Sequence, residues 1–396
     1  MRRALFLGGA CLALAACTDP VSPPPAALRP SLLTAPAAFQ RYVAMGTSNS
    51  QGVQSGGNSA ATQRTAWPAQ LAARVGVPFS QPLFQDPGCS PPLIPPLAAN
   101  AALVLAFGDQ LVNAVMTTCA PLRDGIVPPT NNVAISGADV HDALYSTVES
   151  QTLRNARIGT LYSRVLAPGQ TQVTAMLAQS PTFVSVELAA NDVLPASTGR
   201  ISAMTPYADW QTDYDQVIAA VRTTGARAVL VGLPNNAANF PSIRRAREFF
   251  NEWPDLLALG VSVSFSCYFS SNYLFIPGYV LTLLSRTPTT ATCADVPGAA
   301  DYVLTPSDVN AINARMAQIN AHIQAQASAN GYAYFSLSSL YDLPKPGFDM
   351  YKVLFSSTPF GANMSLDGVH PSAQGQGILA AAAAAAVNAR YGLAIP

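Results

Sequence analysis

The sequence predicts an α/β fold whose parallel sheet is covered by helices on both faces. Short apolar runs alternate with longer segments of helical periodicity along most of the chain. The short runs are almost continuously apolar, which is typical of strands in a parallel sheet that is buried on both faces. The chain has 396 residues, of which 49% are hydrophobic, so it is long enough to bury a large core.

Five candidate strands account for the short apolar runs. They lie at residues 41–46, 131–136, 182–188, 227–233 and 332–337. The helical candidates fall between and after them, at residues 66–75, 138–149, 208–223, 307–330 and 373–390.

Two of the predicted helices have clear sequence signals. In residues 307–330, Val309, Ile312 and Met316 recur at helical spacing. The segment 373–390 contains an unbroken alanine run, and alanine is the best helix former and lets a helix pack closely on a sheet. We therefore interpret this run as structure and not as a low-complexity tail.

The N-terminal 38 residues are predicted to direct export and to tether the protein. Two arginines follow Met1 and precede a short apolar stretch, which predicts a signal peptide at residues 1–16. Small residues before Cys17 resemble a bacterial lipobox, which implies cleavage there and a lipid on Cys17. Residues 17–38 are rich in proline and predict an extended linker. An ordinary signal peptide followed by an incidental cysteine is the alternative.

Composition restricts the partners and the location. Formal net charge is zero and only 11% of residues are charged, which excludes a basic footprint for nucleic acid. Beyond the N-terminus we find no stretch apolar enough to cross a bilayer, so we expect membrane contact through the lipid anchor. Thr18 replaces the aspartate that retains some lipoproteins at the inner membrane, which favours the outer membrane or the cell surface.

Four cysteines remain downstream of the anchor: Cys89, Cys119, Cys267 and Cys293. An even number in an oxidising compartment predicts two disulfides, for which the sequence permits three pairings. Pairs Cys89 with Cys119 and Cys267 with Cys293 are preferred, because each would staple one long insertion. A zinc site is the weaker alternative, because no CxxC pair is present.

The rest of the chain, residues 39–396, is predicted to be one domain with two insertions. Residues 77–130 are rich in proline and apolar residues, and residues 234–304 hold many aromatic residues. Insertions at strand ends are where α/β sheets place substrate contacts. A satellite hydrophobic core is the alternative for the aromatic insertion.

Two distant segments carry the residues of a hydrolytic triad. Asp367 and His370 lie three residues apart, so one loop can present a carboxylate that orients the imidazole. Ser48 follows a strand and a glycine, a position typical of a nucleophile on a sharp turn. A serine hydroxyl needs a base to take its proton, and a histidine oriented by a carboxylate supplies one.

Two further strand ends offer donors for an oxyanion. Gly137 follows the second predicted strand and can present its backbone N–H, and Asn191 follows the third and can present its side-chain amide. Together with the N–H of Ser48 they form a candidate three-donor oxyanion hole, in which each donor typically contributes about 3 to 4 kcal/mol of transition-state stabilisation.

The order of these blocks resembles the SGNH, or GDSL-type, serine hydrolases, including bacterial lipoproteins of that family. Ser48, Gly137, Asn191 and His370 match the four letters in order, over a resemblance that runs from about residue 40 to the C-terminus. It implies a three-layer α/β/α sandwich with a five-stranded parallel sheet and no required metal or cofactor. Asp367 would orient His370.

This sequence departs from the family pattern at two positions. Thr47 replaces the aspartate before the nucleophile, and Ala189 replaces a glycine two residues before Asn191. Thr47 is not a triad member, so the replacement concerns turn geometry and rate. Alanine at position 189 is tolerated if its φ is negative.

The remaining polar candidates give weaker signals. His141 is expected on a solvated helix face, and His322 is expected to be a surface or packing residue. Asp139, Asp142 and Asp192 can cluster near His141, but their spacing requires no metal. Asp192 is expected to fix the loop that presents Asn191.

The sequence thus predicts an exported serine esterase that cleaves carboxylic esters, either acyl lipids or small acyl esters, through an acyl-enzyme. Two alternatives remain open. One is an O-deacetylase of polysaccharides that uses the same triad. The other is a non-catalytic surface binding lipoprotein that retains the fold.

Overall fold

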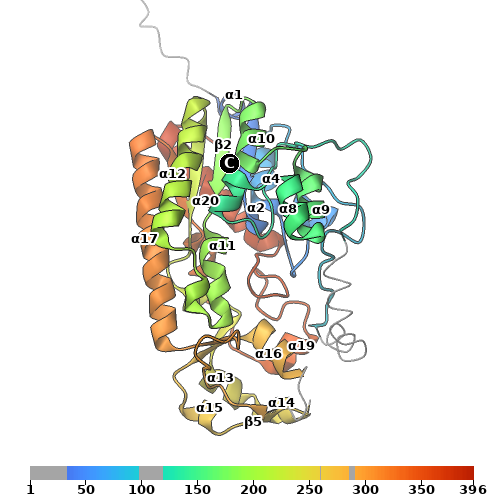
Figure 1. Ribbon diagram of the computed structural model, residues 1–396, viewed down its shortest axis with the longest axis vertical. Helices are drawn as coiled ribbons and strands as arrows, with labels where there is room; N and C mark the ends of the chain where they lie inside the picture. The colour runs from blue at the N-terminus through green and yellow to red at the C-terminus, as the bar shows by residue number, and fades with distance from the viewer. Residues whose placement is uncertain (1–33, 98–118, 259, 285–289) are drawn as a thin grey trace, which may run out of the picture. The chain divides into compact units, whose positions relative to one another are not determined.

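The computed structural model describes residues 34–97, 119–258, 260–284 and 290–396. Its main sheet holds four parallel strands in the order β1-β2-β3-β9. These are β1 (Tyr42–Gly46), β2 (Phe183–Glu187), β3 (Arg227–Gly232) and β9 (Ala333–Ser336). All four lie where the sequence predicted strands. Figure 1 shows β2 within this sheet, between helices.

The fifth predicted strand, at residues 131–136, is reduced to one parallel bridge between Asn132 and Ala44. The segment runs beside β1, with hydrogen bonds from Ala44 N to Asn131 O and from Val133 N to Ala44 O. On the side away from β1, the side chain of Asn132 takes the place of a neighbouring strand, because its Oδ1 accepts a hydrogen bond from Ala134 N. The expected five-stranded sheet is therefore four strands and an extended edge.

Helices cover both faces of the sheet. One face carries α4 (Trp67–Val75) and α20 (Ala373–Tyr391), which pack on each other and place Ala380, Ala383 and Ala384 in the core. The alanine run is a helix, as predicted, and its small side chains allow this close packing.

The opposite face carries α10 (Gln172–Ala178), α12 (Tyr207–Thr223) and α17 (Pro306–Asn330). Figure 1 shows α12 and α17 side by side, and the two helices are in contact. Their buried side chains form a second core with the sheet, which includes Trp210, Tyr214 and Ile319.

The predicted helix 138–149 is two helices. The first, α7 (Val140–Tyr145), is capped by Asp139, and the second, α8 (Val148–Arg154), is capped by Thr147. Each side chain accepts a hydrogen bond from the third residue of its helix, so Thr147 starts a new helix. Helix α9 (Ala156–Val165) follows directly and packs on α8.

The described parts of the first insertion hold mainly isolated bridges, which pair Phe84 with Leu122 and Cys89 with Cys119. Cys89 and Cys119 form one disulfide, and Cys267 and Cys293 form the other. Both pairings are those preferred from the sequence. The remainder of this insertion, residues 98–118, lies outside the described residues.

The second insertion carries its own small elements. Strands β4 (Ile243–Arg245), β6 (Tyr273–Phe275) and β8 (Val303–Leu304) form an antiparallel sheet, and β5 (Ser262–Val263) pairs with β7 (Thr290–Ala291). Its short helices are α13 (Ala246–Asn251), α14 (Trp253–Ala258), α15 (Ser266–Phe269) and α16 (Ile276–Leu284). Phe249 and Leu274 belong to the same core as α4 and α20, so this insertion is not a satellite core.

Helix α1 (Ala35–Ala38) lies at the end of the predicted linker, and Ala38 and Phe39 are buried. The folded part thus begins a few residues before the predicted position 39. The signal peptide, Cys17 and the rest of the linker lie outside the described residues. Within the described ranges, none of the helices has the length and hydropathy needed to cross a membrane.

Candidate active site

The turn after β1 presents the candidate nucleophile. Strand β1 ends at Gly46, and Ser48 is the first residue of the short helix α2 (Ser48–Gln51). The turn is compact, because a Cβ at position 46 would lie 2.6 Å from Ser50 Oγ and 3.0 Å from Glu187 O. Only glycine at position 46 leaves room for this packing.

A buried carboxylate, Glu187, holds the nucleophile turn. One of its oxygens accepts from Thr47 N at 3.1 Å, Thr47 Oγ1 at 3.0 Å and Ser50 Oγ at 3.0 Å. Trp67 Nε1 donates to Ser50 Oγ at 3.1 Å, so the Ser50 hydroxyl is left to donate to Glu187. Burial raises the pKa of Glu187, and the hydrogen bonds from Thr47 and Ser50 oppose that rise.

This network accounts for threonine at position 47. The Thr47 hydroxyl donates to Glu187, whereas an aspartate there would place a second carboxylate against the buried Glu187 side chain. Two carboxylates that share one buried site repel each other. Threonine therefore fits the geometry of this turn.

The structure brings Ser48, His370 and Asp367 together from segments more than three hundred residues apart. Ser48 Oγ lies 2.9 Å from His370 Nε2, and His370 Nδ1 lies 2.8 Å from Asp367 Oδ2. These contacts match the geometry of a hydroxyl, a base and an orienting acid.

The carboxylate of Asp367 is held in its ionised form. Burial alone would raise its pKa, but the charge of the His370 ring and hydrogen bonds from His370 and Val369 lower the pKa of Asp367 to about 2. Its Oδ1 accepts from the backbone N–H groups of Val369 and His370 at 2.9 and 2.8 Å. An ionised carboxylate in this position keeps the proton on His370 Nδ1.

The loop after α2 also donates hydrogen bonds to the Asp367 carboxylate and to Ser365 beside it. Gly56 N donates to Asp367 Oδ2 at 2.5 Å, and Ser55 N donates to Ser365 Oγ at 2.8 Å. Ser365 Oγ in turn donates to Asp367 Oδ1 at 3.1 Å. These contacts leave no local signal in the sequence, because they join segments far apart in the chain.

Asn191 lines the same cavity as Ser48, and the turn that carries Gly137 is tied to α2. Gly137 occupies a turn with φ of 82°, which favours glycine, and Ser136 N donates to Gln51 Oε1 at 2.9 Å, which ties this turn to α2. Within the part of the chain that the structure describes, the N–H groups of Ser48 and Gly137 donate to no protein acceptor. Both are therefore available to a ligand.

Asn191 lies in the short helix α11 (Ala190–Val193), which follows β2. Its Nδ2 donates one hydrogen bond to Ala138 O at 2.8 Å, which leaves its second N–H for another acceptor. Ala189 has φ of 165° and ψ of −21°, so its φ is not negative as expected, but it lies near ±180° and outside the left-handed region that favours glycine.

Asp192 joins α11 to α7 through a hydrogen bond from Val140 N at 3.3 Å. This contact fits its expected role in fixing the loop that presents Asn191. Burial, followed by the charge of Asp139, raises the pKa of Asp192 to about 7.

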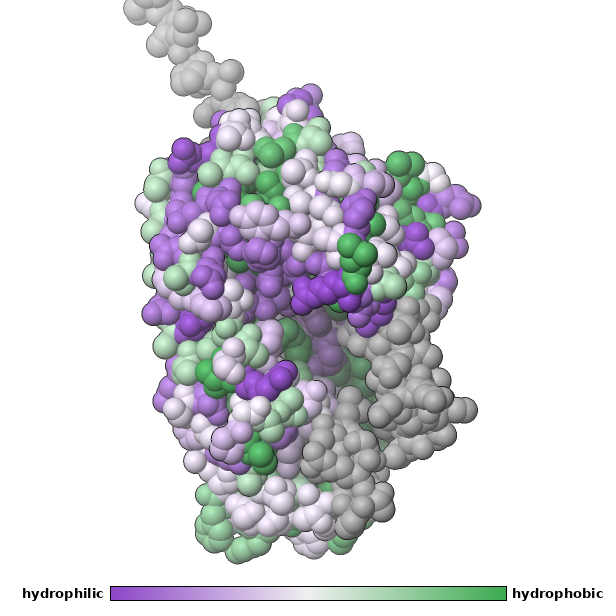
Figure 2. Space-filling model, in the orientation of Figure 1, coloured by the Kyte–Doolittle hydropathy of each residue, from purple (hydrophilic) through white to green (hydrophobic). Residues whose placement is uncertain are grey.

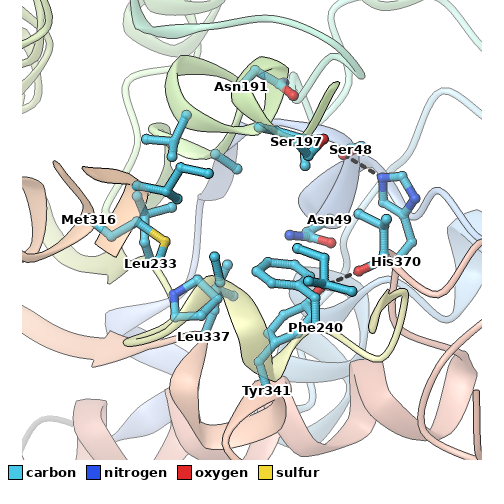
Figure 3. Close-up of a pocket in the computed structure, with 18 of the residues that line it drawn as sticks. Ser48, Asn49, Asn191, Ser197, Leu233, Phe240, Met316, Leu337, Tyr341 and His370 are labelled. Atoms are coloured by element: carbon cyan, nitrogen blue, oxygen red, sulfur yellow. Dashed lines mark hydrogen bonds between the residues drawn. The ribbon is translucent and has the colours of Figure 1, made fainter. Parts of the chain in front are cut away.

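A narrow apolar slot opens at Ser48 and His370 (Figure 3), with a volume of about 60 Å³. Its walls come from both cores and the second insertion, and Asn49 and Ser197 add polar groups. The apolar side chains that line it include Val193, Leu194, Leu233, Phe240, Ile243, Phe275, Ile312, Met316 and Leu337. We call this cavity the apolar slot.

The other two histidines lie away from this site. His141 is exposed and its Nδ1 lies 2.8 Å from Asp213 Oδ2, and His322 Nε2 lies 2.6 Å from Asp215 Oδ1. Asp139 and Asp142 cap α7 and do not gather around His141. Among the described residues, no group of histidine, cysteine and acidic side chains could hold a metal ion.

A scan against family models matches residues 42–383 to GDSL-like lipase/acylhydrolase. The chain belongs to this family. The match spans most of the chain and includes every residue of the candidate site, so the protein is a member of a family of SGNH-type ester hydrolases.

Several solved structures match most of the chain at low identity. A protein from Parabacteroides merdae, named as a GDSL-like lipase, is 12% identical with a TM-score of 0.36, and the match covers 88% of this chain and 96% of that one. An acetylxylan esterase mutant from Geobacillus stearothermophilus is 10% identical, with a TM-score of 0.35 over 89% and 94% of the two chains. An extracellular lipase from Streptomyces rimosus is 18% identical, with a TM-score of 0.34 over 86% and 98%. No curated protein gives a significant match.

Proposed function

We propose that this GDSL-family protein is an exported serine esterase that cleaves carboxylic esters with an apolar acyl chain. The observation that carries the proposal is the pair of contacts from Ser48 Oγ to His370 Nε2 and from His370 Nδ1 to Asp367 Oδ2, at the mouth of the apolar slot. A serine activated in this way attacks ester carbonyls.

The reaction follows from the hydrogen bonds at the site. His370 Nε2 takes the proton of Ser48 Oγ as the oxygen attacks the ester carbonyl, and the oxyanion accepts from Ser48 N, Gly137 N and Asn191 Nδ2. The protonated His370 then gives its proton to the alcohol oxygen as the carbon–oxygen bond breaks. Water, deprotonated by His370, releases the acid from Ser48.

The shape of the apolar slot supports a linear acyl group. It is narrow and lined mainly by aliphatic and aromatic side chains, so it suits a hydrocarbon chain better than a sugar ring. The slot therefore favours acyl groups longer than the acetyl group that an O-deacetylase removes.

The activity is tested with p-nitrophenyl butyrate and a fluorophosphonate probe. Ser48→Ala and His370→Ala should reduce turnover by at least about 10³-fold, because the hydroxyl and its base act as a unit. Ser150→Ala and His141→Gln are matched controls on the surface and should keep wild-type turnover. Wild-type turnover in either Ser48→Ala or His370→Ala would refute the assignment, and absence of both turnover and probe labelling in folded wild-type protein would favour a binding lipoprotein.

We further propose that the protein is exported and anchored by a lipid on Cys17, at the outer membrane or cell surface. The two disulfides support an extracytoplasmic location, because such bonds persist in oxidising compartments. Mass spectrometry of the mature protein should find a diacylated N-terminal cysteine, and Cys17→Ser should release the protein from the membrane fraction. An unmodified N-terminus at another position would contradict the anchor.

A further inference from the structure

A second cavity adjoins the candidate oxyanion residues. Gly137, Ala138 and Asn191 line it, and Asn191 also lines the apolar slot. Its volume is about 450 Å³, much larger than that of the slot. We call it the polar cavity, and its polar lining includes Ser90, Asp139, Asp142, Gln151, Arg154, Arg157 and Tyr162.

The polar cavity offers hydrogen-bond donors that the protein does not use. Arg157 is half-buried, and its guanidinium makes a hydrogen bond to Ser90 Oγ at 2.7 Å. Among the described residues it has no carboxylate partner, although a guanidinium carries five N–H donors. Burial lowers the pKa of Arg157, so a bound anion would also offset its desolvation.

Two carboxylates that line the polar cavity are partly engaged within the protein. Asp139 Oδ1 accepts from Asp142 N at 2.8 Å, and Asp142 Oδ1 accepts from Ser146 Oγ at 2.5 Å and from Gln151 Nε2 at 3.2 Å. These carboxylates serve the cap of α7 and its link to α8. The donors that remain for a ligand are those of Arg157.

We propose that the polar cavity binds the alcohol part of the ester, and that this alcohol carries an anionic group bound by Arg157. The inference rests on the proposed esterase function. An ester whose carbonyl oxygen lies at Asn191 can place its acyl chain in the apolar slot and its alcohol in the polar cavity, because both cavities meet at that residue. Figure 2 shows this face of the molecule hollowed near its middle, where hydrophilic and hydrophobic surfaces meet.

The test compares alcohols that carry the same butyryl group. Four butyryl esters are used, of glycerol 3-phosphate, glycerate, glycerol and p-nitrophenol, so that phosphate and carboxylate anions are compared with neutral alcohols. Wild-type kcat/KM should be about tenfold or more higher for at least one anionic ester than for the glycerol ester, which is the gain typical of a charge-assisted hydrogen bond.

The variant Arg157→Gln should remove that preference. Its kcat/KM for the anionic ester should fall about tenfold further than its kcat/KM for p-nitrophenyl butyrate, mainly through KM. Arg154→Gln should cause a smaller loss, because Arg154 is exposed. Arg164→Gln, a matched control on the same helix α9 whose Nε donates to Ala120 O, should keep the wild-type preference.

Each outcome separates this inference from the proposed function. Turnover of p-nitrophenyl butyrate without a preference for either anionic ester would overturn the inference and leave the esterase standing. An equal loss on all four esters in folded Arg157→Gln would also overturn it, because that pattern indicates a structural role. No turnover of any ester by folded wild-type protein would refute the esterase itself.

Discussion

At the scale of single residues, the chemistry of the site depends on two buried carboxylates with opposite surroundings. Asp367 receives hydrogen bonds from His370, Val369 and Gly56, and the positive charge of a protonated His370 would stabilise it further. Glu187 has no cationic partner among the residues that the structure describes, and it depends on neutral donors from Thr47 and Ser50. The pKa of Asp367 is lowered and that of Glu187 is raised. As pH rises, ionisation of Asp367 therefore increases the free energy of unfolding, whereas ionisation of Glu187 decreases it.

Asp367 should make stability depend on acid pH. Its folded-state pKa of about 2 lies below the ordinary 3.8, so its contribution is present above about pH 4 and is lost as pH falls through 2. The contribution is about 2 kcal/mol. Chemical unfolding at pH 5, 3 and 2 should show a steeper fall in unfolding free energy for wild type than for Asp367→Asn. Parallel pH dependences in the two proteins would show that the carboxylate is not stabilised by folding.

Glu187 should be needed to hold the nucleophile turn. In Glu187→Gln the side chain keeps one acceptor, but its NH₂ group faces the donors of Thr47 and Ser50. Loss of the buried acceptor should lower the unfolding free energy by about 1 to 3 kcal/mol and should lower kcat more than it raises KM. Denaturation curves and p-nitrophenyl butyrate kinetics measure both quantities. The exposed control Glu149→Gln should change neither, and a Glu187→Gln protein with wild-type kcat would show that the turn does not need this carboxylate.

At the scale of elements, α17 links the sheet to the apolar slot. The helix packs on β3, and two of its side chains, Ile312 and Met316, line the slot. Figure 3 shows Met316 across the slot from Ser48 and His370. Its predicted apolar stripe thus serves the core along most of its length and the site near its N-terminal half.

A larger side chain on α17 should shorten the acyl chain that the slot accepts. Met316→Trp should lower the ratio of kcat/KM for p-nitrophenyl octanoate to that for the acetate by about tenfold, because the indole occupies space that a long chain needs. Initial rates over a series from acetate to decanoate give this ratio. Asn310→Trp lies exposed on the same helix and should keep the wild-type profile. An unchanged profile in Met316→Trp would place the acyl chain elsewhere.

At the scale of the whole domain, the second insertion completes the site. Phe240, Ile243 and Phe275 line the apolar slot, and the Cys267–Cys293 disulfide closes the segment that follows β4. The insertion is held by the same core as the sheet, so its stability and the shape of the slot are coupled.

Removal of this disulfide should lower the free energy of unfolding and weaken the binding of long acyl chains in the apolar slot. Cys267→Ala with Cys293→Ala should lower the unfolding free energy by about 3 kcal/mol, as expected for a loop of this size. Octanoate turnover should fall more than acetate turnover. Thermal unfolding and the two rates check this, with Cys89→Ala and Cys119→Ala as the matched pair from the other insertion. Equal losses of octanoate and acetate turnover would show that the second insertion does not contribute to acyl binding.

The order of strands and helices and the candidate catalytic residues could both be predicted from local sequence patterns. Continuous apolar runs predicted four of the strands, because strands buried on both faces cannot alternate. Helical spacing predicted α17, and the alanine run predicted α20. With only three histidines in the chain, the motif with His370 and Asp367 singled out one base.

The groups that surround these candidate catalytic residues could not be predicted in this way, because they come from distant parts of the chain. Glu187 is a charged residue inside an apolar strand, and that local signal could have marked it, but its partners Thr47 and Ser50 lie about 140 residues away in the chain. The apolar slot, the hydrogen bonds to Asp367 and the polar cavity likewise join residues from several elements. Local sequence patterns determine which elements form, whereas a cavity exists only where packed elements leave space between them.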